Sequence, residues 1–396
     1  MPLYDVAVIG AGPVGSRVAN KLARAGYRTI VLERKASLDG PVCCTGIISE
    51  ECARDFGIDR NLILREASSA RFFSPSGKVL RLARPEPLAC IVDRPAFNAD
   101  MAKQAQAAGA EYVLGCPAGS VDVQIDRVRV ETGRVGNTGC IEAKAVVIAA
   151  GSGSKLVAEL GLGKVGDFAM GAQAVVETSG LDEVEVYLGR KIVPAFFGWL
   201  APASPNRALV GLMSRRRSAF YLKRLLSFLA AQGKIASADV ELSFASVPLK
   251  PLARTYGNRL LAVGGAAGQV KPTTGGGIYY GLLCADIAAD TLCESLKSGD
   301  LSAKSLSRYQ KVWRARLGWE IRTGRWARRL YESLSDSKID RILDIISSSG
   351  LGKSLIESDD ISFDWHGMII MKLLGQKAFA GLAGVARVPV SLRREP

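Results

Sequence analysis

The first residues of the chain follow the hydrophobic pattern of a strand, a helix and a second strand. Residues 4–10 are almost wholly apolar, as in a strand buried on both faces of a sheet. Residues 16–25 carry apolar positions at helical spacing and end at Gly26, a residue favoured just after a last helical turn. Residues 28–33 form a second, β-branched run. This order predicts a strand–helix–strand unit of a parallel sheet.

The same criteria predict elements along the rest of the chain. Buried strands are expected at 145–154, which ends in small residues, and from 260 into a glycine-rich turn. Alternating apolar positions predict strands of a second sheet at 172–176, 185–188 and 209–212. Helical spacing predicts helices over 96–108, 279–296, 304–332 and 365–386.

Composition and charge narrow the class of protein. Of 396 residues, 48% are hydrophobic and 23% charged, which excludes wholesale disorder. A net charge of +14 indicates an anionic partner, such as nucleic acid, a membrane surface or a phosphorylated substrate. With His366 as the single histidine, a His-rich metal site is excluded, and no metal is expected. No secretory leader or uninterrupted apolar run of spanning length is visible, so we expect a cytoplasmic location.

The turn after the first strand has the spacing of a dinucleotide-binding motif. It contains Gly10, Gly12, Pro13 and Gly15 and leads into the predicted helix. In this motif the first glycine permits a tight turn, the second lets the backbone approach a pyrophosphate, and the third lets helix and strand pack closely. Glu33 ends the second strand, where a carboxylate accepts hydrogen bonds from ribose hydroxyls and repels a 2′-phosphate. The motif also occurs by chance, but here strand, helix and acid agree with it.

Later segments are candidates for the same site. The strand ending at Ala150-Gly151 has the small side chains that a nearby cofactor requires. Two glycine-rich turns, at 264–268 and 272–278, offer amides for the pyrimidine end of a flavin or for an anionic reduced flavin. Arg94, between a strand and a helix, suits a flavin edge or a phosphate. The alternatives are a packed glycine-rich corner and a solvated arginine.

Together these residues resemble the FAD-dependent geranylgeranyl reductases, which share their fold with the p-hydroxybenzoate hydroxylase group of flavoproteins. The resemblance covers nearly the whole chain. It rests on the N-terminal motif with Glu33, the segment Pro-Val-Cys-Cys-Thr-Gly-Ile-Ile at 41–48, Arg94, the Ala150-Gly151 strand end and the Pro-Thr-Thr-Gly-Gly-Gly-Ile loop at 272–278.

Two departures from the family pattern stand out. Gly265 replaces the usual aspartate that binds ribitol or ribose hydroxyls, which removes one anchor for FAD. The substrate motif at 194–202 keeps both prolines and Trp199, but Phe197 replaces a tyrosine and Ala201 a phenylalanine. The resemblance therefore implies an apolar pocket without the phenol.

The resemblance implies an α/β composite fold, in which a Rossmann-type FAD-binding domain carries an inserted antiparallel sheet and a helical C-terminal region. The expected boundaries are 1–165 for the main FAD-binding part, with a small strand insertion near 66–93. The β-sheet substrate domain is expected at 166–255, a return to the FAD domain at 256–300 and the helical region at 301–396.

The resemblance also assigns site residues. Cys44 is the implied catalytic residue, because it matches the family's cysteine near the flavin. The implied FAD-binding residues are Gly10, Gly12, Pro13, Gly15, Glu33, Arg34, Cys44, Thr45, Gly46, Arg94, Ala150, Gly151, Gly264, Gly265, Gly268, Pro272, Thr274, Gly275, Gly276, Gly277 and Ile278. The implied substrate-binding residues are Pro194, Phe196, Phe197, Trp199 and Pro202. The plain alternative for the last group is sheet core.

The implied activity is reduction of isolated C=C bonds in prenyl chains of a lipid or isoprenoid, by hydride transfer from reduced flavin. NAD(P)H or ferredoxin is the expected electron donor, the latter as a redox partner protein. An aromatic hydroxylase or a quinone-linked dehydrogenase of the same fold is the alternative enzyme. A halogenase is disfavoured, because its W-x-W-x-I-P signature is absent. A prenyl-binding protein that has lost its flavin is the non-enzymatic alternative.

The basic surplus is concentrated in the C-terminal third. Residues 304–332 contain nine Lys and Arg but only Glu320 and Glu332 as acids, and the segment carries Tyr309, Trp313, Trp319 and Trp326. This pattern predicts peripheral contact with anionic lipid on the inner face of the membrane, in preference to nucleic acid. The plain alternative is a solvated helix whose aromatic face packs on the body. The apolar helix at 365–386, interrupted by Lys372 and Lys377, suits an interfacial or tunnel-lining place.

Overall fold

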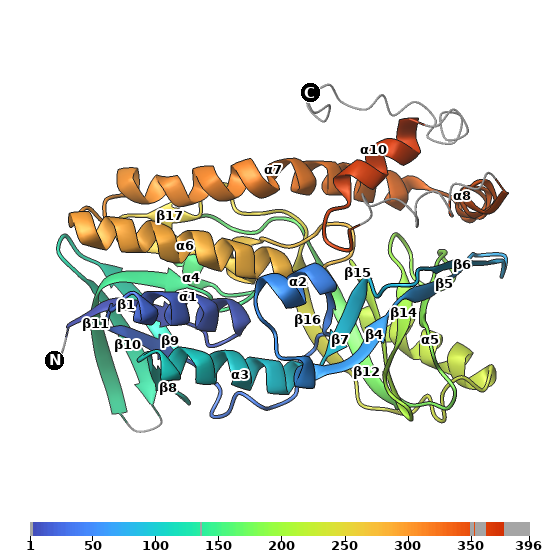
Figure 1. Cartoon of the computed structure of the whole chain (residues 1–396), viewed down its shortest axis with the longest axis horizontal. Helices are drawn as coiled ribbons and strands as arrows, with labels where there is room; N and C mark the ends of the chain where they lie inside the picture. Colours follow the sequence, from blue (N-terminus) through green and yellow to red (C-terminus); the bar gives the residue numbers. More distant parts are fainter. Residues whose placement is uncertain (1–2, 135–136, 349–351, 353–361, 376–396) are drawn as a thin grey trace.

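An eight-stranded sheet with a parallel centre forms the first layer of the fold (Figure 1). The computed structural model describes residues 3–134, 137–348, 352 and 362–375. The main strand order is β17-β18-β11-β1-β2-β8, and β10 and β9 extend from β11 as an antiparallel pair. The bounds are β1 Leu3–Ile9, β2 Thr29–Leu32, β8 Glu111–Val113, β9 Ala118–Val123, β10 Val128–Arg134, β11 Asn137–Ile148, β17 Tyr256–Gly257 and β18 Leu260–Ala262.

Helices cover one face of this sheet and pack on one another. Helices α1 (Pro13–Arg24), α3 (Arg94–Ala107), α6 (Ile278–Ser298) and α7 (Ala303–Ser333) share one core with the buried side chains of that face. The strands β9 and β10 and the short helix α4 (Leu156–Glu159) enclose a second core on the other face. Burial on both faces explains why β1 and β2 are continuous apolar runs.

Two of these helices begin earlier than the hydrophobic pattern predicts. Helix α1 starts at Pro13 rather than at 16, and α3 starts at Arg94 rather than at 96. Proline suits the first turn of a helix because a backbone N–H at that position would have no intrahelical partner, so its absence costs no hydrogen bond. In α3 the Asp93 side chain also caps the helix by accepting from the Ala96 amide at 3.0 Å.

A seven-stranded sheet forms the second part of the fold, in the order β16-β12-β15-β14-β13-β5-β6. Helix α5 (Ser218–Ala231) packs on one of its faces. The strands are β5 Ser69–Phe73, β6 Val79–Ala83, β12 Phe168–Glu177, β13 Val184–Tyr187, β14 Gly198–Ser204, β15 Arg207–Ser214 and β16 Ser243–Pro248. β5 pairs in parallel with β13, so the hairpin from the 66–93 stretch belongs to this sheet.

Small elements connect the two large sheets. A three-stranded sheet has the order β3-β7-β4, with β3 Ile47–Ser49, β4 Ile63–Ala67 and β7 Ala89–Val92. The short helices are α2 Glu50–Asp55, η1 Arg60–Leu62 and η2 Gly264–Ala267. β3 follows the 41–46 segment directly and β7 leads directly into α3, so this small sheet places the cysteine segment beside the start of α3.

The C-terminal helices lie over both sheets (Figure 1). α7 confirms the helix predicted at 304–332, but its Tyr309 and Trp313 are buried in the core. α8 (Asp336–Ser348) packs through Leu343 and Ile339 against side chains of β5 and β6. α10 spans Gly367–Gly375 and contacts α7. Residues 376–386 of the predicted apolar helix lie outside the described part of the chain, and no helix within that part is long and apolar enough to cross a membrane.

Candidate active site

Backbone segments approach one another too closely for side chains where β1 and β11 end. A Cβ atom added to Gly10 would lie 2.6 Å from the carbonyl oxygen of Ala149. A Cβ added to Gly15 would lie 1.9 Å from the carbonyl oxygen of Gly10. Gly10 also has φ +107°, a conformation that favours glycine. The first and third glycines of the motif are therefore fixed by packing.

The side chain of Val14 marks the point where three segments meet. An added Cβ would lie 3.0 Å from Val14 at Gly264 and 2.6 Å from it at Gly281. The first turn of α1, the η2 turn and the first turn of α6 therefore touch at one place. Gly265 brings the strand end at 150–153 to the same place, because its added Cβ would be 3.0 Å from the Ser152 amide nitrogen.

Two helix N-termini at this place have no side-chain cap. Gly12 is the N-cap of α1 and Gly277 that of α6, and neither helix has a side-chain cap hydrogen bond. Apart from its own chain neighbours, no atom lies within 4 Å of a Cβ built on Gly12, so the space beside this residue is open. Free amides and the positive end of the helix dipole make such termini favourable for phosphate groups.

Glu33 lies beside the glycine-rich turn of α1. Its carboxylate accepts from the backbone amides of Ala11 and Lys35, each at 2.9 Å. The side chain is only partly buried, so its remaining lone pairs are available to ribose hydroxyls. Arg34 is exposed. Just after the end of β11, Ala150 is exposed and Gly151 is partly buried.

The side chain of Arg94 has buried hydrogen-bond donors for which the described residues provide no acceptor. The residue is only 9% exposed, and its Nε and Nη1 atoms are buried without a hydrogen-bond partner among the described residues. Its side chain packs on Gly46, where an added Cβ would be 2.9 Å from Arg94 Cγ, and on the ring of Phe97. Buried guanidinium donors without acceptors are costly, so this arrangement fits a bound polar group such as a flavin.

The loop before α6 joins the first-layer site to the second sheet. An added Cβ on Gly275 would lie 2.5 Å from Met213 Sδ in β15 and 3.1 Å from Val247 in β16. Thr274 and Gly276 hold the turn, because the Gly276 amide donates to Thr274 Oγ1 at 3.4 Å. Gly268 lies at the back of the loop, where its added Cβ would be 2.6 Å from the Lys250 carbonyl oxygen.

Both cysteines of the 41–48 segment are free thiols, partly buried next to one another. Burial raises the pKa of the Cys43 thiol, which therefore stays protonated at neutral pH. The next residue, Thr45, connects the segment to the second sheet. Its hydroxyl donates to Gln173 Oε1 of β12 at 2.7 Å and accepts from Trp199 Nε1 of β14 at 2.9 Å.

Trp199 lies flat across the neighbouring strand because that strand has a glycine there. Trp199 pairs with Gly211 of β15, and Gly211 pairs with Gln173 of β12. A Cβ added to Gly211 would lie 2.4 Å from the indole ring. Phe197 lies beside this ring, with the two ring centroids 6.0 Å apart. Trp199 and Phe197 thus form an aromatic surface next to the cysteine segment.

The other residues predicted to bind substrate have less free surface. Phe196 is completely buried in the core that α5 covers, so its ring has no surface left for a ligand. Pro202 is buried and Pro194 is partly buried. Neighbouring residues of a strand point to opposite faces, which is why Trp199 and Leu200 differ in exposure although both are apolar.

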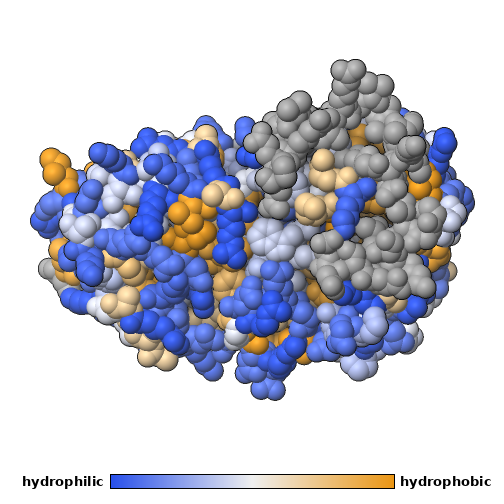
Figure 2. All heavy atoms as spheres, turned by 45° about the horizontal axis from the view of Figure 1, so that its top comes forward, coloured by the Kyte–Doolittle hydropathy of each residue, from blue (hydrophilic) through white to orange (hydrophobic). Residues whose placement is uncertain are grey.

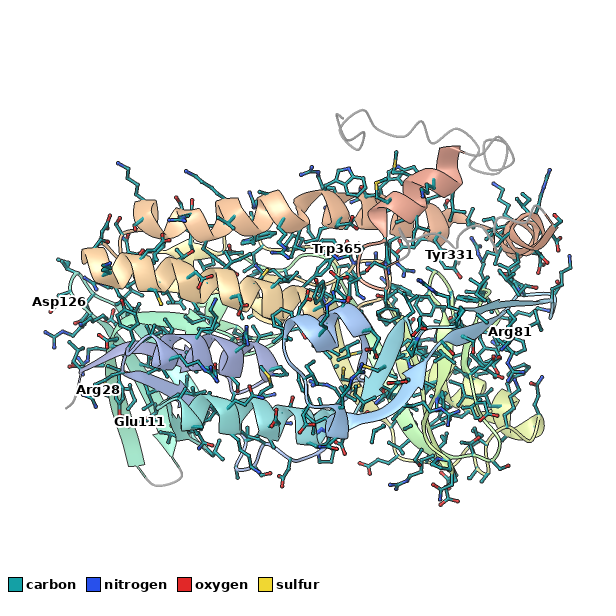
Figure 3. All side chains as sticks on the ribbon, in the orientation of Figure 1. Arg28, Arg81, Glu111, Asp126, Tyr331 and Trp365 are labelled. Atoms are coloured by element: carbon teal, nitrogen blue, oxygen red, sulfur yellow. The ribbon has the colours of Figure 1, made fainter. Side chains whose placement is uncertain are left out.

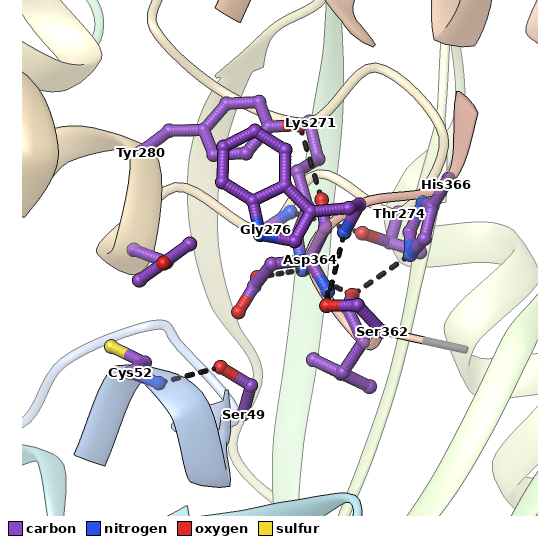
Figure 4. A network of polar contacts seen from close by, with 12 residues as sticks. Ser49, Cys52, Lys271, Thr274, Gly276, Tyr280, Ser362, Asp364 and His366 are labelled. Atoms are coloured by element: carbon purple, nitrogen blue, oxygen red, sulfur yellow. Dashed lines mark hydrogen bonds and ion pairs between the residues drawn. The ribbon is translucent and has the colours of Figure 1, made fainter. Parts of the chain in front are cut away.

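The 362–367 segment is fixed to the loop before α6 by a buried ion pair (Figure 4). Lys271 Nζ and Asp364 Oδ1 are 2.5 Å apart, and both side chains are almost fully buried. His366 Nε2 donates to the Phe363 carbonyl at 2.8 Å, so Nδ1 accepts from Thr273 Oγ1 at 2.6 Å. Burial, and secondarily the charge of Lys271, lower the pKa of His366 to about 3. His366 is therefore neutral at physiological pH and holds the loop.

Sequence reasoning missed Gln173, Gly211 and the Lys271–Asp364 pair. A glutamine in the middle of the apolar run 172–176 was the available signal for Gln173, because a buried amide requires a partner. No local signal exists for Asp364, since its partner is more than ninety residues away in sequence.

Comparison with known proteins places the chain in a family. A family model described as pyridine nucleotide-disulphide oxidoreductase matches residues 4–183. The digeranylgeranylglycerophospholipid reductase of Methanocaldococcus jannaschii is 27% identical over 363 residues, covering 88% of this chain and 91% of the relative. Digeranylgeranylglycerophospholipid reductase 2 of Methanothermobacter thermautotrophicus is 30% identical over 355 residues, covering 86% and 91%. The chain belongs to the digeranylgeranylglycerophospholipid reductase family.

Solved structures agree with this assignment. A geranylgeranyl bacteriochlorophyll reductase-like protein from Thermoplasma acidophilum has a TM-score of 0.85 at 25% identity, covering 97% of this chain and 99% of that one. A flavin-dependent halogenase has a TM-score of 0.63 at 17% identity and shares the fold. The predicted resemblance and the α/β flavoprotein fold are confirmed, and as a member of the reductase family the protein is an FAD-dependent oxidoreductase.

The packing of Trp199 on Gly211 gives a testable prediction. In Gly211→Ala the new methyl group displaces the indole ring, and overpacking of this kind costs about 1–3 kcal/mol of stability. We expect kcat/KM for a prenyl substrate to fall by about tenfold or more, because small displacements of positioning groups are costly. The measurement is steady-state kinetics together with denaturant unfolding.

Gly119→Ala in β9 is the matched control. Its added Cβ would lie 3.6 Å from the Glu131 carbonyl oxygen, an ordinary contact distance. This variant should keep wild-type kinetics. Equal kinetics for Gly211→Ala and Gly119→Ala would show that the position of the Trp199 ring does not matter for turnover.

Proposed function

We propose that this protein saturates isolated C=C bonds in the prenyl chains of a glycerophospholipid substrate. The observation that carries the proposal is the pairing of two features at one place. Arg94 has two buried donors without acceptors where it packs on Gly46, and the Phe197–Trp199 surface is hydrogen-bonded to the adjacent residue, Thr45. A polar cofactor fits the first feature and an apolar chain fits the second. The names of the family's curated members support the substrate class.

FAD, when bound, supplies the hydride for this reaction. The N-terminus of α1 would hold its pyrophosphate, Glu33 its adenosine ribose, and Arg94 with the 272–278 loop its ring system. Gly265 takes the place of an acidic anchor, but the absence of a side chain there lets the 150–153 turn approach η2.

The chain itself must position the alkene and exclude water. An isolated C=C bond has no carbonyl to polarise, so orientation in a dry slot lowers the barrier. Trp199 is held by Thr45 on its nitrogen and by Gly211 under its ring, which fixes one wall of that slot. Phe72 and Leu80 of the same sheet pack against α8, so the β5–β6 edge of the sheet is covered by apolar side chains.

Cys44 is our candidate for delivering the proton to the second alkene carbon. It precedes Thr45, whose hydroxyl is fixed between Gln173 and Trp199, so its backbone is held at the edge of the slot. Its neighbour Cys43 has a raised pKa because of burial, which makes it a weaker acid than a solvated thiol.

Exchange of the thiol tests this role. In Cys44→Ser we expect kcat for alkene reduction to fall about a hundredfold, since general acid catalysis contributes roughly 10²–10⁴. FAD affinity should stay at the wild-type value. Single-turnover kinetics measures the first quantity and flavin fluorescence titration the second. Cys43→Ser is the matched control with near-wild-type turnover, and an unimpaired Cys44→Ser variant would remove Cys44 from the mechanism.

Production of the protein in a host that makes unsaturated prenyl lipids tests the activity itself. We expect lipid masses to rise by two hydrogens for each reduced bond. The external donor in this proposal is NAD(P)H or a reduced ferredoxin, and purified protein supplied with each reductant in turn identifies it. Unchanged lipids in the presence of protein that carries reduced FAD would contradict the proposed function.

We also propose that the exposed side of α7 binds the anionic surface of a membrane from the cytoplasmic face. Tyr309 and Trp313 are buried, so the contact depends on charge more than on aromatic residues. Figure 2 turns this side forward and shows that hydrophilic residues predominate on its described part. The exposed basic residues of the helix are Lys304, Arg308, Lys311, Arg314, Arg316, Arg322 and Arg329.

Flotation with liposomes tests the membrane contact. Each basic residue near an anionic surface contributes about 1 kcal/mol, so Lys311→Glu combined with Arg322→Glu should weaken binding by more than about tenfold. Lys103→Glu, on the exposed side of α3, is the control that should bind as the wild type does. Failure of the wild-type protein to float with anionic vesicles would refute this contact.

A further inference from the structure

Arg328 of α7 is buried against two loops that come from different parts of the chain. The residue is 6% exposed. Its Nε donates to the Pro272 carbonyl at 3.2 Å, its Nη1 donates to the Ala195 carbonyl at 3.0 Å, and its Nη2 donates to the Thr273 carbonyl. Its guanidinium therefore joins the loop before α6 to the segment that precedes Phe197 and Trp199.

The positive charge of Arg328 has no carboxylate partner among the described residues. The nearby acid Glu332 pairs with Arg215, at 2.9 Å. Around Arg328 lie backbone carbonyls and the rings of Phe196, Phe197 and Tyr331, the first with its centroid 4.5 Å from Cζ. Figure 3 shows Tyr331 at the end of α7 above the second sheet, and Trp365 further along towards α2.

Burying this cation costs free energy that an apolar side chain at the same place would not cost. Desolvation lowers the pKa of Arg328 to about 10, so the group remains protonated at neutral pH. A buried charge without a counter-charge destabilises a fold unless carbonyl dipoles or a ligand offset it. The three carbonyl acceptors offset part of that cost, and an anionic ligand nearby would offset more.

The acceptors of Arg328 belong to the loop that we place against FAD. The carbonyls of Pro272 and Thr273 are in the same peptide groups as the amides of Thr273 and Thr274. A charged donor on a carbonyl polarises its peptide group, and linked hydrogen bonds strengthen one another. The loop then runs to the uncapped N-terminus of α6 at Gly277. Arg328 thus adds positive potential to a loop that leads into an uncapped helix N-terminus, which already favours an anion.

We propose that Arg328 raises the reduction potential of FAD bound on the 272–278 loop. Two-electron reduction by the external donor, with uptake of one proton from solvent, adds one negative charge to the flavin. Positive potential at the loop stabilises this reduced form relative to the oxidised form. Arg328 is a positioning and electrostatic residue that acts through Pro272 and Thr273. The proposal depends on the proposed function only for the placement of FAD.

The midpoint potential of the bound flavin tests this role. In Arg328→Met we expect the ratio of affinities for reduced and oxidised FAD to fall by about tenfold, which is about 30 mV for a two-electron couple. Arg328→Lys retains the charge and should stay near the wild-type potential. The measurement is equilibration of the flavin-loaded protein with indicator dyes of known potential, without any lipid substrate.

Three further variants separate charge from packing. Tyr331→Phe removes the hydroxyl that donates to the Phe196 carbonyl at 3.2 Å without a change of charge, and should leave the potential unchanged. Arg329→Met removes an exposed charge one residue away and should also leave it unchanged. If Arg328→Met does not fold, Arg328→Gln takes its place, because it is neutral but still offers a donor to the loop carbonyls.

The results that would refute this role of Arg328 differ from the results that would refute the proposed activity. A potential that is unchanged in the neutral Arg328 variants, or that falls equally in Arg328→Lys, would overturn the electrostatic role. Loss of prenyl reduction in the wild-type protein would instead refute the activity, whatever the potential is. A lower potential in the neutral variants alone, with wild-type values in Tyr331→Phe and Arg329→Met, supports the role.

Discussion

The contact of backbone with backbone at the ends of β1, β11 and β18 is the constraint on which the rest of the structure depends. Gly10, Gly15 and Gly265 lie where an additional carbon would crowd neighbouring backbone, and a carbon on Gly281 would overlap the Val14 side chain. The close contact brings the N-termini of α1 and α6 to one place. Both termini lack a side-chain cap, the space beside Gly12 is open, and Glu33 accepts from the Ala11 amide in the turn before α1. Packing of the backbone therefore requires glycine at these positions of the dinucleotide motif, independently of nucleotide binding.

The C-terminal third holds the second half of the site in position. Lys271 and Asp364 fix the loop before α6 to the 362–367 segment, and the neutral His366 binds Thr273 of the same loop. Arg328 connects that loop to the segment before Trp199. On the other side, Thr45 connects the cysteine segment to Trp199 and Gln173. The cofactor side and the apolar side are thus joined by polar contacts at two separate places.

The part of the site that is local in sequence could be predicted from the sequence, and the part made by distant contacts could not. The turn at 10–15, the position of Glu33 and the helix at 304–332 follow from spacing and periodicity within short windows. Arg328 looked like one more basic residue of an exposed face, because periodicity does not reveal which loops pack on a helix. Tyr309 and Trp313 were candidates for a lipid surface for the same reason. The pairing of β5 with β13 joins residues more than a hundred positions apart and leaves no local signal.

The central claim is that one site combines a flavin with a dry surface for an isolated alkene, and that no oxygen is required. Anaerobic single turnover tests it most directly: holoenzyme reduced beforehand is mixed with a prenyl lipid, and flavin absorbance and lipid mass are followed together. The account predicts that the flavin is reoxidised without oxygen and that one C=C bond is saturated for each flavin reoxidised. Flavin that stays reduced until oxygen enters, with the lipid unchanged, would contradict it and would point to a hydroxylase.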